Sequence, residues 1–160
     1  AGRHAGVPLV EGARTLAGVR AARRLEPRVT PAGWTLIDDA YNASPESMAA
    51  AFETASQMPR SGRLLALLGE MRELGPFAED AHRRTGAHAR DVFDGVAVVD
   101  LGWGPVLAEA AGGQLVHDLA EGAEWVRRHA NPGDVVLVKA SHGVALDQVV
   151  DELLGAERAR

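Results

Sequence analysis

The sequence of 160 residues contains no cysteine, so disulfides, thiol nucleophiles and thiolate metal sites are excluded. It also has no long hydrophobic run, because charges or glycines interrupt every apolar stretch before the roughly 18 residues that a membrane helix needs. Residues 1–8 show neither the basic nor the apolar segment of a secretory signal. These absences predict a soluble cytoplasmic protein without membrane insertion.

Positive charge is sparse and scattered. The net charge is −5, and the basic residues cluster only as pairs such as Arg23-Arg24. Nucleic-acid surfaces usually need a basic stripe, so that class of partner is not expected. Lysine occurs once, at Lys139, beside sixteen arginines. Its retention suggests a task for a compact ammonium, with chance retention on the surface as the alternative.

Three catalytic signatures are missing as well. No GxxxxGK[ST] sequence is present, so the chain has no P-loop for a triphosphate and is predicted to be inactive alone. No GxSxG elbow accompanies Ser141 and His142, and adjacent residues cannot easily adopt the geometry of nucleophile and base. His82 and His88 lie six residues apart, off the spacing of paired helical ligands, so no metal site is expected and His82 is interpreted as a helix-surface residue.

Short apolar runs alternate with helix-period segments from residue 34 onward. We expect strands at 34–37, 64–68, 96–99, 114–117 and 135–138, and helices at 45–58, 78–92, 104–111, 119–130 and around 146–154. Such strands, apolar on both faces and separated by single helices, predict an α/β, Rossmann-like, doubly wound and mostly parallel sheet with helices on both faces. Residues 31–157 are assigned to this domain. Residues 1–30, with one short helix near 8–16 and no clear period after residue 18, are assigned to the tail of a preceding domain and a linker.

Functional groups in such sheets gather in the loops after the carboxyl ends of the strands. The loop of residues 38–45 offers Asp39, Tyr41 and Asn42, which could hold a sugar or a nucleotide or could simply make the turn. Ser44 is expected to cap the helix that begins at Pro45.

Two further strand-end loops carry candidate groups. In residues 69–76, Glu70 could bind an amine or a magnesium-bound water, or could pair with Arg72 on the surface. In residues 139–143, a lysine, a hydroxyl and a flexible glycine could hold a carboxylate or a phosphate-bearing group. The loop of residues 100–104 completes the set.

Three segments together resemble the Mur ligase family: Asp38-Asp39-x-Tyr41-Asn42-Ala43-x-Pro45, Leu68-Gly69-Glu70-Met71-x-Glu73-Leu74-Gly75 and Val138-Lys139-Ala140-Ser141. The resemblance covers about residues 7–154. Its first two motifs are most similar to the branch that joins D-alanyl-D-alanine to UDP-N-acetylmuramoyl-tripeptide. Residues 7–20 resemble the last helix of the family's central ATPase domain, and Arg24-Leu25-Glu26 resembles the entry into its C-terminal domain.

The resemblance implies a bacterial enzyme of three domains that acts in peptidoglycan precursor synthesis. ATP would phosphorylate the tripeptide carboxylate, and the amine of D-alanyl-D-alanine would attack the acyl phosphate. ATP and Mg²⁺ would be bound mainly by the central domain, which also supplies the catalytic residues, while this domain closes over the nucleotide and presents the dipeptide.

The resemblance also assigns residues. Arg24 would meet the γ-phosphate and Asp39 the ribose, with Tyr41 and Asn42 near the nucleotide. The dipeptide site would be lined by Glu70, Lys139, Ser141 and His142. Two positions depart from the family pattern: Ser44 replaces an asparagine, and His142 replaces an arginine.

Two other interpretations remain open from the sequence. One is a domain of another Mur-type or folylpolyglutamate-type ligase, against which the Tyr41-Asn42-Ala43 segment argues. The other is a stand-alone Rossmann-like binding module, against which the missing GxGxxG argues.

Overall fold

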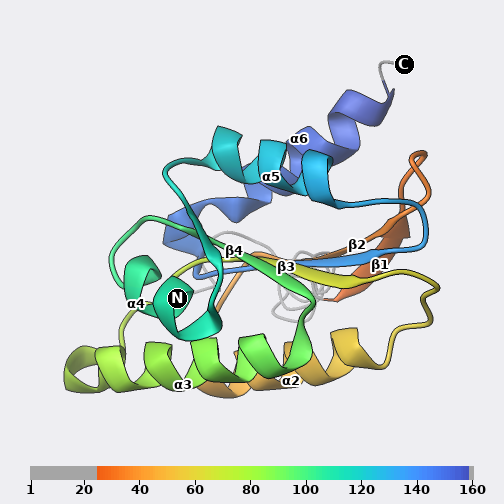
Figure 1. Ribbon diagram of the computed structural model, residues 1–160. Helices are drawn as coiled ribbons and strands as arrows, with labels where there is room; N and C mark the ends of the chain where they lie inside the picture. Colours follow the sequence, from red (N-terminus) through yellow and green to blue (C-terminus); the bar gives the residue numbers. More distant parts are fainter. Residues whose placement is uncertain (1–24, 159–160) are drawn as a thin grey trace, which may run out of the picture.

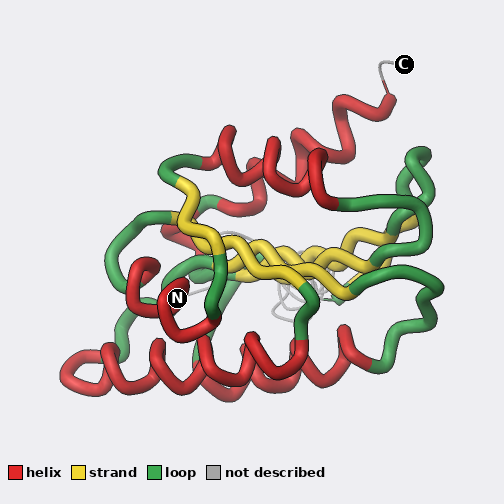
Figure 2. Tube along the Cα trace, in the orientation of Figure 1, coloured by secondary structure: helices red, strands yellow, loops and turns green. Residues whose placement is uncertain are grey.

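A six-stranded sheet lies between two layers of helices in the computed structural model, which describes residues 25–158 (Figures 1 and 2). The strand order is β1-β2-β6-β3-β4-β5. Only β1 runs antiparallel to its neighbour, and the other pairs are parallel. The strands are β1 (Glu26–Val29), β2 (Thr35–Asp39), β3 (Leu64–Leu68), β4 (Gly95–Val99), β5 (Gln114–Val116) and β6 (Val135–Lys139). The predicted fold class is confirmed.

The helices divide between the two faces of the sheet (Figure 1). One face is covered by α2 (Pro45–Ser56), α3 (Ala78–Val92) and α4 (Gly104–Ala111), and the other by α5 (Leu119–His129) and α6 (Leu146–Arg158). Alternate residues of each strand feed the two cores: Leu65 packs with Trp125 on the α5 side, and Leu64 with Phe52 on the α2 side. Because helices cover both faces of the sheet, all five residues of β3 are apolar and buried.

Strand β1 was not expected, because residues 18–31 show no period and were assigned to a linker. This expectation was wrong for Glu26–Val29, which pairs with β2 in the register Glu26↔Asp38. An edge strand that leaves Val29 77% exposed has no buried face to impose an alternating pattern, and Pro27 is tolerated at an edge. The sheet thus includes four residues of that stretch. The helix expected near 8–16 and the tail of a preceding domain lie outside the described residues, and the division of the chain stays a prediction.

The helix that follows each strand changes to the other face of the sheet at β6. This strand lies between β2 and β3, which are followed by α2 and α3 on one face, whereas β6 is followed by α6 on the other face. In open α/β sheets, the crevice at such a switch point, outside the carboxyl ends of the strands, is where ligands bind. The loops of residues 38–45, 69–76 and 139–143 meet there.

Candidate functional site

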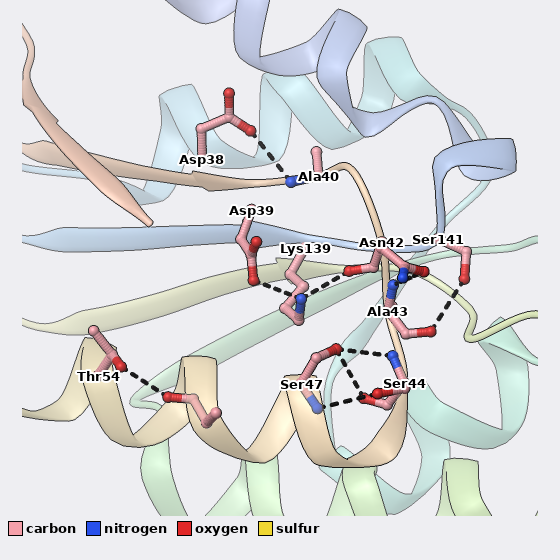
Figure 3. Close-up of polar contacts among 11 residues, drawn as sticks. Asp38, Asp39, Ala40, Asn42, Ala43, Ser44, Ser47, Thr54, Lys139 and Ser141 are labelled. Carbon is pink, nitrogen blue, oxygen red and sulfur yellow. Dashed lines mark hydrogen bonds and ion pairs between the residues drawn. The ribbon is translucent and has the colours of Figure 1, made fainter. Parts of the chain in front are cut away.

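A buried ion pair joins the carboxyl ends of β2 and β6. Asp39 and Lys139 are direct partners in the parallel register. Lys139 Nζ lies 2.5 Å from Asp39 Oδ2 and donates a second hydrogen bond of 2.8 Å to the carbonyl of Asn42 (Figure 3). The lysine side chain is 1% exposed and that of Asp39 13%. Chance retention of the lysine on the surface is therefore wrong, and its ammonium supports the loop that follows β2.

That loop is shaped by its own polar side chains. Asp38 Oδ1 accepts a hydrogen bond of 3.2 Å from the backbone N–H of Ala40, on the opposite side of the strand from Asp39 (Figure 3). The predicted cap is confirmed: Ser44 Oγ accepts from Ser47 N, and Ser47 Oγ accepts from Ser44 N, which forms a reciprocal capping box. Asp38, Ser44 and Ser47 thus shape the turn, whereas Asp39 takes part in the buried pair with Lys139.

The exposed tip of the same loop reaches the loop after β6. Tyr41 and Asn42 are both exposed, and the ring of Tyr41 packs against that of His142 with centroids 5.5 Å apart. Asn42 Oδ1 accepts from the backbone N–H of Ala43 at 2.8 Å. Tyr41, which is predicted to lie near the nucleotide, therefore contacts His142, which is predicted to line the dipeptide site.

Glu70 is clamped from two sides in the loop after β3. Its Oε1 accepts from Arg72 Nε at 2.7 Å, and its Oε2 accepts from the backbone N–H of Trp103 at 3.2 Å. The residue is only 7% exposed, so the expected pairing with Arg72 is present but not as a surface contact. Gly102 permits this arrangement, because its φ is +54° and a Cβ there would lie 1.9 Å from Glu70 Oε2.

Ser141 connects three loops. Its backbone N–H donates to the carbonyl of Glu70 at 3.1 Å, and its Oγ accepts from the backbone N–H of Arg72 at 2.9 Å. The same hydroxyl lies 3.5 Å from the carbonyl of Ala43. Ser141 is 5% exposed, so its hydroxyl serves the junction of the loops after β2, β3 and β6.

His82 proves to be a buried residue rather than the surface residue expected. Its Nε2 accepts from the backbone N–H of Met71 at 2.8 Å, and its Nδ1 lies 2.6 Å from the carbonyl of Ala78, to which it donates. Its exposed fraction is 0%. Burial lowers the pKa of the imidazole, against smaller opposing effects of the Ala78 hydrogen bond and the Glu70 charge. The sequence pattern missed it because α3 turns the face with Ala78, His82 and Ala89 inward.

The structure thus groups the predicted site residues differently from the sequence. It brings Lys139 together with Asp39 and Asn42, and Glu70 together with Ser141; Arg24 lies outside the described residues. Sequence reasoning missed Trp103, which lines a hollow of about 490 Å³ with residues 70–75 and Ala78. The available signal in the sequence is its position in the loop of residues 100–104, directly after an expected strand. The ligand assignments themselves stay predictions.

Among residues 25–158, no three histidine or acidic side chains are grouped so that they could hold a metal ion. None of the helices placed there combines the length and the apolar character needed to cross a membrane.

The chain matches the family model described as "Mur ligase, glutamate ligase domain" over residues 23–142. It is 33% identical to the UDP-N-acetylmuramoyl-tripeptide–D-alanyl-D-alanine ligase of Bacillus subtilis, over 96% of this chain and 35% of that protein. It is 36% identical to the ligase of the same name from Mycobacterium tuberculosis, over 94% of this chain and 34% of that protein. The chain therefore spans about one third of the length of these curated relatives.

Solved structures agree on the fold. The MurF ligase of Thermotoga maritima, crystallised with ADP, superposes with a TM-score of 0.72 at 27% identity, covering 92% of this chain and 36% of that one. Escherichia coli FolC superposes with a TM-score of 0.63 at 22% identity, covering 96% of this chain and 41% of that one, which shows a shared fold alone. With a family model that matches most of the chain, and a sheet whose motif loops meet at its switch point, this chain belongs to the Mur ligase family as its glutamate ligase domain.

Proposed function

We propose that this chain is the C-terminal domain of an ATP-dependent amide ligase that joins D-alanyl-D-alanine to UDP-N-acetylmuramoyl-tripeptide through an acyl phosphate. The observation that carries the proposal is the junction at β6, where Lys139 and Ser141 bind the two loops that hold the family motifs. The names of the curated relatives support the choice of substrates.

The junction suits a domain that closes onto a nucleotide held elsewhere. Asp39 presents a carboxylate at the carboxyl end of β2, fixed by the buried ammonium of Lys139, and would accept hydrogen bonds from ribose hydroxyls. Tyr41 projects an exposed ring beside it, 45% accessible, that would lie against the nucleotide. Arg24 would meet the γ-phosphate. Such groups act by positioning the reactants, which is the main contribution a protein makes to phosphoryl transfer.

Mg²⁺ would be bound by the central domain of the enzyme. The described acidic side chains do not form a cation site, since Asp39 is paired with Lys139 and Glu70 with Arg72. Mg²⁺, bound with ATP, would neutralise charge on the phosphates. The present domain contributes nucleotide and dipeptide contacts, and its partners are the central and N-terminal domains of the same enzyme.

The direct test is phosphate release by the full-length enzyme with ATP, magnesium and UDP-N-acetylmuramoyl-tripeptide. We expect release with D-alanyl-D-alanine and none with glutamate or other single amino acids. The 160-residue chain by itself should release no phosphate, because it has no P-loop. Release with a single amino acid in place of the dipeptide would show that the amine substrate is that amino acid. Turnover of ATP by the isolated chain would contradict its assignment as one domain of the ligase.

A variant of Asp39 tests the nucleotide site. The sequence alone suggests Asp39→Ala, but that change would remove the carboxylate that pairs with the buried ammonium of Lys139. Asp39→Asn retains a hydrogen-bond acceptor for Lys139, and it removes the carboxylate charge from both the buried ion pair and the contact to ribose. We expect KM for ATP to rise about 10-fold, the loss of one hydrogen bond to a charged group, with KM for the dipeptide unchanged. An unchanged KM for ATP would remove Asp39 from the nucleotide site.

A folylpolyglutamate-type ligase is the second candidate, and the shared fold with FolC is the observation in its favour. Two observations argue against it. The 33–36% identity to the D-alanyl-D-alanine ligases extends over nearly the whole chain. The exposed Tyr41 and Asn42, which belong to the distinguishing motif, lie at the site itself. Phosphate release that depends on glutamate together with a folate acceptor, in place of the UDP-linked tripeptide and the dipeptide, would favour this alternative.

A further inference from the structure

Arg72 lies at the junction of the loops and has no role in the function proposed above. Its guanidinium rests on the backbone of the loop after β6, because a Cβ built at Gly143 would lie 2.0 Å from Arg72 Nη1. The side chain is 45% exposed, and Arg72 lines the same hollow as Trp103.

Hydrogen bonds fix both the side chain and the backbone of Arg72. Its Nε donates to Glu70 Oε1 at 2.7 Å, and Glu70 is anchored in turn by the backbone N–H of Trp103. The backbone N–H of Arg72 is bound by Ser141 Oγ at 2.9 Å, and that of the preceding residue, Met71, by the buried His82. Two consecutive backbone groups and the side chain of Arg72 are thus fixed before any ligand arrives.

Glu70 occupies only one of the five N–H donors of the guanidinium. In the part of the chain that the structure describes, Arg72 makes no ion pair other than the one with Glu70. Its Nη1 and Nη2 therefore remain for an external anion. A guanidinium offers parallel N–H groups that match the two oxygens of a carboxylate, whereas the neighbouring imidazole of His142 has no such pair.

The position also fits the reaction. Gly143, on which Arg72 rests, adjoins His142, and the ring of His142 packs against Tyr41 in the proposed nucleotide loop. Arg72 is therefore linked through a single loop to the proposed nucleotide site. We propose that Arg72 binds the carboxylate of the incoming amine substrate, which is D-alanyl-D-alanine if the proposed function holds.

The test compares D-alanyl-D-alanine with its C-terminal amide in the full-length enzyme. Arg72→Gln should raise KM for the dipeptide about 10- to 100-fold, since a charge-assisted contact is lost, and leave KM for ATP unchanged. The wild-type enzyme should prefer the carboxylate over the amide, and the variant should lose that preference. Arg72→Lys should fall in between, because an ammonium keeps the charge but not the paired donors.

Arg128→Gln is the matched control, because Arg128 also donates its Nε to a glutamate, Glu124, but lies on α5 away from the loops. It should behave as wild type. Equal kinetics for the Arg72 and Arg128 variants would overturn the proposal and leave the proposed function intact. A loss by Arg72→Gln that is equally large for the amide would also overturn it, as a structural effect. Failure of the wild-type enzyme to use the dipeptide would overturn the proposed function and the dipeptide assignment together.

Discussion

Lys139→Met should lower the free energy of unfolding by about 3 kcal/mol. The change removes a buried ammonium that serves both Asp39 and the carbonyl of Asn42. Asp39, whose side chain is 13% exposed, would then lose the lysine cation, and the carbonyl of Asn42 would lose the lysine donor. Urea unfolding of the 160-residue chain at neutral pH measures the loss.

Two comparisons make this result specific. Arg83→Met removes one partner of an exposed ion pair with Glu79 on α3 and should cost less than about 1 kcal/mol. The double variant Lys139→Met/Asp39→Asn should recover part of the loss, because the carboxylate charge that the lysine balanced is removed as well. A cost for Lys139→Met no larger than that for Arg83→Met would show that the buried pair does not stabilise the loop.

His82→Ala should cost a similar amount, about 3 kcal/mol. The imidazole is fully buried and satisfies two backbone groups, the N–H of Met71 and the carbonyl of Ala78. Alanine would leave both unsatisfied beside a new cavity. His82→Gln is the milder variant, because its amide can still accept from Met71. Urea unfolding at pH 7.5, where the wild-type imidazole is neutral, compares the three proteins.

The same residue makes stability depend on pH with a defined sign. Burial depresses the pKa of His82 in the folded state below the ordinary value of about 6.5. Below that value the unfolded chain binds a proton that the folded chain excludes, so acid favours unfolding. Stability should therefore fall as the pH drops from about 6.5 towards the folded-state pKa, by at most about 1.4 kcal/mol per pH unit from this group. His82→Gln should remove that part of the slope, and identical slopes in the two proteins would contradict the assignment.

Most of the secondary structure followed from local pattern. The bounds of β3, α3 and α4 were predicted to the residue. A strand buried on both faces appears in the sequence as an apolar run, and a helix appears as apolar residues at helical spacing. The cap at Ser44 followed from a serine placed directly before Pro45. Strand β1 escaped prediction because an exposed edge strand depends on pairing with β2, which has no local signal.

The sequence by itself determined the α/β class, the loops that carry chemistry and the family they resemble, since each depends on residues close together along the chain. Only the tertiary structure decided the partners of those loops. Lys139 meets Asp39 across 100 residues, and Ser141 meets Arg72 across 69. Such pairings depend on the position of β6 between β2 and β3. The register of these strands is set by the packing of both cores. For that reason burial made His82 a structural group, and the fold placed the guanidinium of Arg72 against Gly143 in the loop after β6.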